Sequence, residues 1–116
     1  MFHEDGDLRD RTFQSGRRVA RLHRALPARD RLAQNYGDQL VRAANSVASN
    51  YREAQRGRST AEYRSKLGDC LREADETHLW RECLGADSVV PPPRHAARQT
   101  EVGELIAIFV TLLRKR

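Results

Sequence analysis

The sequence of 116 residues contains little of what characterises several large protein classes. Its seven glycines and four prolines are too few for a collagen-like or low-complexity chain. Its longest apolar stretch, residues 105–113, is far shorter than the roughly 20 residues that a membrane-spanning helix requires. Aromatic residues make up only 6% of the chain, which leaves few side chains to stack on nucleic-acid bases. A membrane-spanning protein is therefore excluded, and recognition of single strands by stacking is not expected.

Cysteine is also scarce, since only Cys70 and Cys83 are present. Both lie in one predicted helix, where a rise of about 1.5 Å per residue places them roughly 20 Å apart. A disulfide needs Cα atoms less than about 7 Å apart, so they cannot pair within that helix. The sequence has no Cys-x-x-Cys pair and no His and Cys cluster with zinc-binding spacing. We expect two free thiols and no zinc site.

Residues 1–9 do not have the composition of a secretion signal. They include Glu4, Asp5 and Asp7 and lack an apolar segment, so no signal peptide is predicted. We expect residues 1–9 to form a flexible segment. We also expect a cytoplasmic protein, because a reducing compartment keeps both thiols free.

Charge is what the sequence has in excess. Charged residues make up 32% of the chain and the mean hydropathy is −0.76, which predicts a soluble domain with a polar surface. The formal net charge is +5, and 19 arginines stand against only two lysines, Lys66 and Lys115. This arginine excess is the feature that a functional hypothesis has to explain.

Hydrophobic periodicity predicts four helices, over residues 10–26, 30–56, 59–85 and 100–113. The first stops before Pro27, because proline disfavours helix at the residue that precedes it. The second and third end near Gly57 and Gly85, the residue type that commonly follows a helix. Residues 10–116 are therefore predicted to form one all-α domain, an antiparallel up-and-down four-helix bundle.

The clearest local signal is the run Ser59-Thr60-Ala61-Glu62. In a capping box, Ser59 accepts from the N–H of Glu62 and the Glu62 side chain accepts from the N–H of Ser59. Asn50 and Glu53 end the preceding predicted helix, and we expect them to satisfy backbone or arginine groups at the turn 56–59. The alternative for Glu53 is a catalytic or ligand-binding carboxylate, for which the sequence offers no nearby nucleophile or base.

Residues with metal-binding or catalytic chemistry do not form a complete set. Asp75 and His78 have the spacing of half a di-metal site in a helix bundle. The last predicted helix offers Glu101 and Glu104 for the other half but no histidine. A nucleophile elbow and a phosphate-binding glycine loop are both absent from the sequence. We predict a non-enzymatic protein without metal or cofactor.

The last predicted helix is apolar around almost its whole circumference. Such a helix is buried on more than one side, whereas a helix of a single four-helix bundle normally leaves one face wet. We therefore expect self-association. The predicted interface residues are Leu105, Ile108, Phe109 and Leu112. The alternative is a central position of this helix in an irregular bundle, without self-association.

The arginines concentrate in the predicted helix 10–26, whose net charge is +4. Arg17, Arg21 and Arg24 share one stripe of that helix. The candidate nucleic-acid contacts come from this helix and from the last residues of the sequence, and they are Arg17, Arg18, Arg21, Arg24, Arg114, Lys115 and Arg116. Such residues neutralise phosphates and release counterions. The alternative is a solvated helix face, with arginine replacing lysine because of a GC-rich genome.

Several motifs follow one another in a characteristic order. They are the asparagine-centred run 46–54, Arg58-Ser59 with Glu62, Lys66-Leu67, the run 73–77 (Glu-Ala-Asp-Glu-Thr) and Trp80. Together they resemble the small bacterial four-helix bundle proteins encoded in intervening sequences of 23S ribosomal RNA genes. The resemblance extends over nearly the whole chain.

The resemblance implies an antiparallel four-helix bundle that assembles into a homopentamer. A related branch is the accessory protein of diversity-generating retroelements, which binds a reverse transcriptase and nucleic acid through a basic surface. The partners so implied are copies of the chain, RNA or DNA, and a reverse transcriptase or another protein, without a membrane. No catalytic residues are implied, because the family has no established catalytic set. The alternative function is a protein–protein interaction module with no nucleic-acid role.

Overall fold

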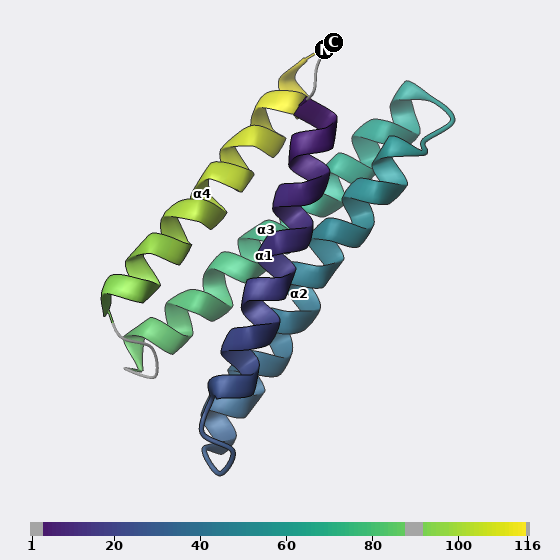
Figure 1. The fold of residues 1–116 in the computed structure, drawn as a ribbon. Coiled ribbons are helices and arrows are strands. Elements are labelled where there is room, and N and C mark those ends of the chain that lie inside the picture. Colours follow the sequence, from purple (N-terminus) through teal and green to yellow (C-terminus); the bar gives the residue numbers. More distant parts are fainter. Residues whose placement is uncertain (1–3, 88–91, 116) are drawn as a thin grey trace.

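The computed structural model of the protein describes residues 4–87 and 92–115. Within these ranges the chain forms no strand and four helices, α1 (Glu4–Ala25), α2 (Arg31–Gln55), α3 (Thr60–Ala86) and α4 (Pro92–Arg114). Successive helices run in opposite directions in a bundle whose Cα extents are 46 × 22 × 19 Å (Figure 1). The predicted all-α, antiparallel up-and-down four-helix bundle is confirmed.

The helix α1 begins earlier than periodicity predicts, at Glu4 instead of residue 10. Leu8 is only 3% exposed and joins the core with residues of the other three helices. The flexible segment predicted over residues 1–9 is therefore wrong for residues 4–9, and residues 1–3 lie outside the described ranges. The reason is that Leu8 is the only large apolar residue in a polar stretch, so no local pattern marks it as buried.

The helix α4 also begins earlier than predicted, at Pro92 instead of Thr100. Proline is tolerated in the first turn of a helix, where the missing N–H would have no partner and the fixed φ is already helical. The consecutive prolines at 92 and 93 therefore open α4, and the start predicted at residue 100 is wrong.

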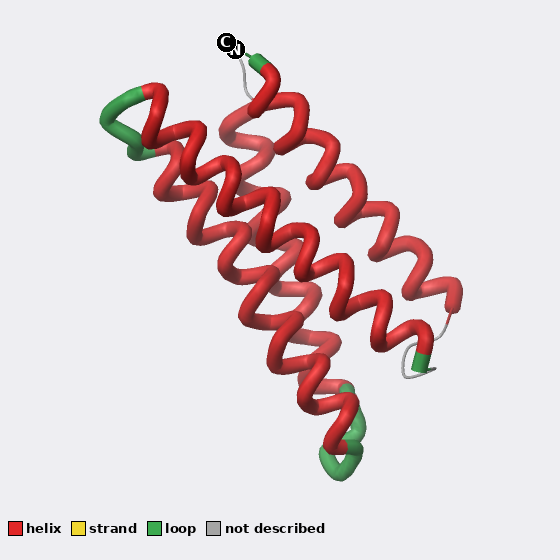
Figure 2. The backbone as a smooth tube through the Cα atoms, turned by 180° about the vertical axis from the view of Figure 1, so that it is seen from behind, coloured by secondary structure: helices red, strands yellow, loops and turns green. Residues whose placement is uncertain are grey.

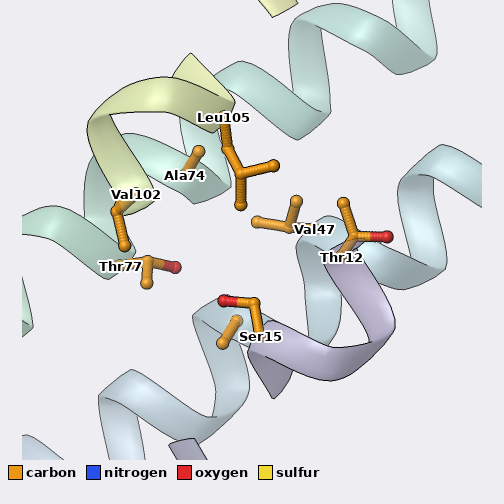
Figure 3. Close-up of a pocket in the computed structure, with 8 residues that line it drawn as sticks. Thr12, Ser15, Val47, Ala74, Thr77, Val102 and Leu105 are labelled. Carbon is orange, nitrogen blue, oxygen red and sulfur yellow. The ribbon is translucent and has the colours of Figure 1, made fainter. Parts of the chain in front are cut away.

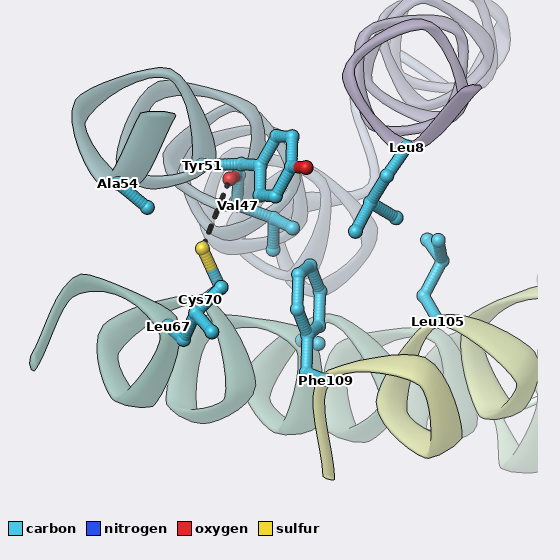
Figure 4. Close-up of a cluster of buried hydrophobic side chains, with 9 residues drawn as sticks. Leu8, Val47, Tyr51, Ala54, Leu67, Cys70, Leu105 and Phe109 are labelled. Carbon is cyan, nitrogen blue, oxygen red and sulfur yellow. Dashed lines mark hydrogen bonds between the residues drawn. The ribbon is translucent and has the colours of Figure 1, made fainter. Parts of the chain in front are cut away.

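The core divides into two clusters along the bundle. The first takes residues from all four helices and includes Tyr51, Leu67 and Phe109 (Figure 4). The second consists of Val19, Leu26, Leu40, Ala44 and Leu84, with no member from α4. The helix α1 packs chiefly on α2, and α4 packs chiefly on α3. The bundle is therefore built around the α2–α3 pair, with the outer helices α1 and α4 on it (Figure 1).

Two glycines allow α1 and α2 to approach each other closely. A Cβ atom at Gly16 would lie 2.6 Å from Asn45 Oδ1, and one at Gly37 would lie 2.5 Å from His23 Cδ2. Both distances are shorter than real contacts, so a side chain at either position would push the helices or these side chains apart. The absence of Cβ at these positions sets how the arginines of α1 lie against α2.

The two cysteines are free thiols, as predicted. Cys70 is buried between α2 and α3, where its thiol donates to the Val47 carbonyl oxygen at 3.7 Å (Figure 4). Burial raises the pKa of the Cys70 thiol to about 12, because a thiolate would lose its hydration there. Cys70 is therefore a core residue and carries no thiolate chemistry at neutral pH.

In the described part of the chain, no helix combines the length and the apolar character needed to cross a membrane.

Candidate functional site

Two of the predicted nucleic-acid contacts are held inside the molecule. Arg17 donates to Asn45 Oδ1 of α2 at 2.8 Å, and its guanidinium lies 5.3 Å from the centroid of the Phe13 ring. Arg18 forms an ion pair with Glu101 of α4. Both arginines are half-buried and connect α1 to its neighbouring helices. Periodicity places them on the polar side of α1 but does not show which polar residues face another helix.

Arg21 and Arg24 lie at the end of α1, and both are exposed. Arg29 in the following turn and Arg31 at the start of α2 are exposed as well, and none of the four has an ion pair among the described residues. We call these four residues the α1–α2 end patch. Sequence reasoning missed Arg29 and Arg31, although a position in the turn after Pro27 and one directly after it were a signal that could have found them.

The acidic residues near the α1–α2 end patch interact with groups other than its four arginines. Asp30 caps α2 by accepting from the Ala33 N–H at 3.0 Å. The side chain of Asp38 pairs with that of His23, with 2.8 Å between Oδ1 and Nε2. The patch therefore carries four guanidinium charges beside one capping carboxylate. Its arginines remain available to an external anion.

The predicted basic group at the end of the sequence lies at the opposite end of the bundle. The C-terminal end of α4, whose last residue is Arg114, lies beside the N-terminal end of α1, whereas the α1–α2 turn is at the far end of the molecule (Figures 1 and 2). The Lys115 carbonyl oxygen accepts from Arg64 at 2.9 Å, which ties this end of the chain to α3. Arg116 lies outside the described residues. The two predicted basic regions therefore do not form one surface.

The predicted interface residues of α4 share one face of the helix but differ in burial, and Ile108 and Leu112 pack at the margin of the core cluster that contains Leu105 and Phe109. Leu105 and Phe109 are buried in the core of the single chain, and the Phe109 ring centroid lies 6.3 Å from that of Tyr51 (Figure 4). Their assignment to an interface is therefore wrong. Ile108 and Leu112 are half-buried and line a shallow surface hollow of about 180 Å³. A helix that is apolar all round has no pattern that tells its core side from its outer side.

The predicted capping box is present in altered form. Ser59 accepts from the Glu62 N–H at 3.1 Å, as predicted, but Glu62 Oε1 accepts from the Arg58 N–H at 3.0 Å instead of that of Ser59. The box therefore reaches one residue further back along the turn. It still satisfies two donors at the start of α3.

The polar residues at the end of α2 contact groups on the helices α2 and α3 and not groups of the turn 56–59. Asn50 donates to the Ser46 carbonyl oxygen at 2.9 Å within α2. Glu53 pairs with Lys66 of α3 at 2.8 Å. The prediction that these two side chains satisfy groups of the turn 56–59 is wrong, because both find partners on the helices themselves.

One small cavity lies between the helices in the described part of the chain. It has room for about one water molecule. Its lining includes the hydroxyl groups of Thr12 and Thr77, which donate to the carbonyl oxygens of Arg9 and Glu73 (Figure 3). Among the described residues, no three His, Cys, Asp or Glu side chains come together as a metal site would require. This cavity is therefore a packing defect of the core.

Comparisons with known proteins agree with this picture. The chain superposes on the crystal structure of a protein of unknown function from the S23 ribosomal protein family of Bacteroides thetaiotaomicron. The TM-score is 0.89 and the identity 22%, over 97% of this chain and 100% of the other, which establishes the shared fold. No curated protein matches the chain. The family model described as 23S rRNA-intervening sequence protein matches residues 4–110, and the chain therefore belongs to this family.

Proposed function

We propose that the protein is a non-enzymatic, self-associating bundle that binds the phosphate backbone of nucleic acid through the α1–α2 end patch. The observation that carries the proposal is the group of four exposed arginines without ion pairs, Arg21, Arg24, Arg29 and Arg31. A cytoplasmic location, the pentamer and a reverse transcriptase partner stay predictions from the sequence and the family resemblance.

Unpaired arginines favour phosphate as a ligand for a physical reason. The guanidinium group is planar and presents paired N–H donors that match two oxygens of a phosphate. Each phosphate that is neutralised also releases condensed counterions, which drives binding at low salt. Arginines that are already paired, such as Arg18, would have to give up Glu101 first. The end patch avoids this loss.

The surroundings favour contact with the backbone over reading of bases. Among the described residues, the only large aromatic side chain classed as exposed is Phe13, at 41%. The guanidinium groups of Arg17 and Arg52 lie 5.3 and 5.7 Å from its ring centroid. Its ring faces are therefore already in contact with cations, and stacking on bases is disfavoured. We expect binding with little sequence preference.

The test removes three charges from the α1–α2 end patch. In the variant with Arg21→Gln, Arg24→Gln and Arg29→Gln, the logarithm of the binding constant should depend less steeply on the logarithm of the salt concentration. The magnitude of the slope should decrease by about 2–3, because each lost phosphate contact removes about 0.9 from it. The measurement is fluorescence anisotropy with short RNA and DNA duplexes of one sequence across a salt series.

The matched control removes three exposed arginines elsewhere, through Arg56→Gln, Arg58→Gln and Arg72→Gln. Its salt slope should stay close to that of the unmodified protein. An equal fall in both variants would contradict a localised site, and no binding even at low salt would contradict a nucleic-acid role. In the latter case the protein–protein interaction module becomes the better hypothesis.

Self-association is assigned to the half-buried residues of α4. Ile108 and Leu112 line the surface hollow together with Ala107, Thr111 and Lys115. Water therefore meets an apolar strip at the margin of the face that α4 turns to the core. A second copy of the chain would bury the same strip, and repetition around a ring would bring several basic patches into one particle.

Light scattering tests this assignment. The unmodified protein should show a mass several times 13.3 kDa, and Ile108→Asp should lower it towards 13.3 kDa, because a carboxylate in the interface would lose its hydration. Leu79→Asp is the control, since Leu79 is an exposed leucine on α3, at 48%. A monomeric unmodified protein, or equal loss of mass in both variants, would remove the proposed α4 interface.

A further inference from the structure

Arg81 is a buried residue whose guanidinium group has no partner among the described residues. Arg81 of α3 is only 4% exposed, and no hydrogen bond or ion pair to it occurs among the described residues. Its Nε atom is fully buried and has no acceptor. A charged group in this position is strongly unfavourable unless something supplies the missing charge and acceptors.

The charged groups around Arg81 add to the excess of positive charge at this position. Those that act on it are Arg18 from α1 together with Arg98 and Glu101 from α4. Glu101 is already shared, because it pairs with Arg18 and its Oε1 lies 3.9 Å from Nη1 of Arg98. One carboxylate therefore faces three guanidinium groups. Among these described side chains, the net charge is therefore +2.

Two further buried polar atoms without partners belong to the same junction. The Nε atom of Arg18 has no acceptor, and Oε1 of Gln99 has no donor. Gln99 donates through its other side-chain atom to the His78 carbonyl oxygen at 3.2 Å, which holds it against α3 one turn before Arg81. The junction thus combines unused donors with an unused acceptor.

The pKa of Arg81 is lowered to about 10, first by burial and then by the charge of Arg98, while Glu101 acts in the opposite direction. The charge of Arg18 also lowers this pKa, so two neighbouring guanidinium groups act against the charge of Arg81 and one carboxylate supports it. Because this pKa remains well above 7, Arg81 keeps its charge at neutral pH.

We propose that Arg81 and Arg98, together with the unpaired Nε of Arg18, bind a phosphate-type oxyanion at the junction of α1, α3 and α4. A doubly charged oxyanion would balance the local charge and give the unpaired donors of these guanidinium groups an acceptor, while the terminal amino group of Arg18 stays paired with Glu101. The acidic hydroxyl of a hydrogen phosphate could donate to Gln99. The Arg98 side chain is 40% exposed, so this side of the junction is open to solvent. The site is separate from the α1–α2 end patch, and neither proposal depends on the other.

The test compares thermal unfolding in phosphate and in chloride at equal ionic strength and pH. The melting temperature of the unmodified protein should rise with phosphate concentration, since a ligand that binds only the folded state stabilises it. Arg81→Met should remove most of this dependence, leaving the general stabilising effect of phosphate on folded proteins. It should also raise the melting temperature in chloride, because an apolar side chain of similar length replaces an unpaired buried charge.

Arg72→Met is the matched control, since Arg72 is an exposed arginine of α3 that pairs with Asp69. It should keep the full phosphate dependence. If Arg81→Met does not fold, Arg98→Gln provides the second variant, and calorimetric titration should show phosphate affinity weakened about tenfold by the loss of one charged hydrogen bond. Equal melting temperatures of the unmodified protein in the two salts, or full phosphate dependence in Arg81→Met or Arg98→Gln, would overturn the proposal.

Discussion

Replacement of Phe109 by alanine is expected to lower the free energy of unfolding by about 3–5 kcal/mol, the range for removal of a buried phenylalanine ring. Phe109 is fully buried, in the cluster that holds all four helices together. Its ring packs near Tyr51 of α2 and beside Leu8 of α1 and Leu105 of α4 (Figure 4). The cavity left behind would loosen the contact of α4 with the rest of the bundle. Chemical denaturation followed by circular dichroism measures the loss.

Ile108→Ala provides the comparison, because Ile108 precedes Phe109 in the chain but is only half-buried. We expect it to cost about 1 kcal/mol of unfolding free energy, since part of its side chain is already in water. The order should reverse for assembly, where Ile108 contributes and Phe109 does not. Equal losses of stability in the two variants would mean that α4 does not present Phe109 to the core.

Replacement of Glu101 by glutamine should lower the free energy of unfolding by about 1–3 kcal/mol, because it removes the negative charge that balances partly buried arginines and replaces it with a neutral, weaker acceptor. Glu101 is the carboxylate that pairs with Arg18 and lies near Arg98. Its removal leaves Arg81 among like charges only. The loss should be largest at low ionic strength, where repulsion between these arginines is least screened. Added phosphate should recover part of it.

Glu104→Gln is the control for this substitution. Glu104 lies three residues further along α4 and also pairs with an arginine of α1, Arg11, at 3.0 Å. The Glu104 side chain is 61% exposed, against 23% for Glu101. An exposed pair contributes about 1 kcal/mol or less, so this variant should be close to the unmodified protein in urea denaturation at several salt concentrations. A larger loss for Glu104→Gln than for Glu101→Gln would contradict the unequal roles of these two pairs.

Most of the architecture could be predicted because it depends on local features. The hydrophobic periodicity that predicts helix 30–56 and the cap at Ser59 are properties of residues close together in the sequence. Both are present in the structure. The turn at Pro27 also separates two helices as predicted, since proline acts on the residue before it. The same locality explains the missed start of α1, where the only large apolar residue, Leu8, is buried by distant parts of the chain.

The candidate sites were less predictable because they depend on contacts between helices. Arg17 and Arg21 belong to one stripe of α1, yet Arg17 bonds to Asn45 whereas Arg21 is exposed. On α4, the pattern does not distinguish Phe109 from Ile108, although Phe109 is fully buried and Ile108 is only half-buried. The shortage of negative charge around Arg81 involves three helices and cannot be read from any one of them.

The sequence by itself determined four helices, most of their ends, their antiparallel order and the family, because caps, prolines and apolar periodicity act over a few residues. Only the tertiary structure decided which arginines are free, which side of α4 forms the core and where a buried charge lacks a partner. The physical reason is that pairing and burial depend on what a neighbouring helix places opposite each side chain. The arginine excess thus separates into Arg17 and Arg18, which hold helices together, the exposed α1–α2 end patch, and Arg81, whose buried charge calls for an anion.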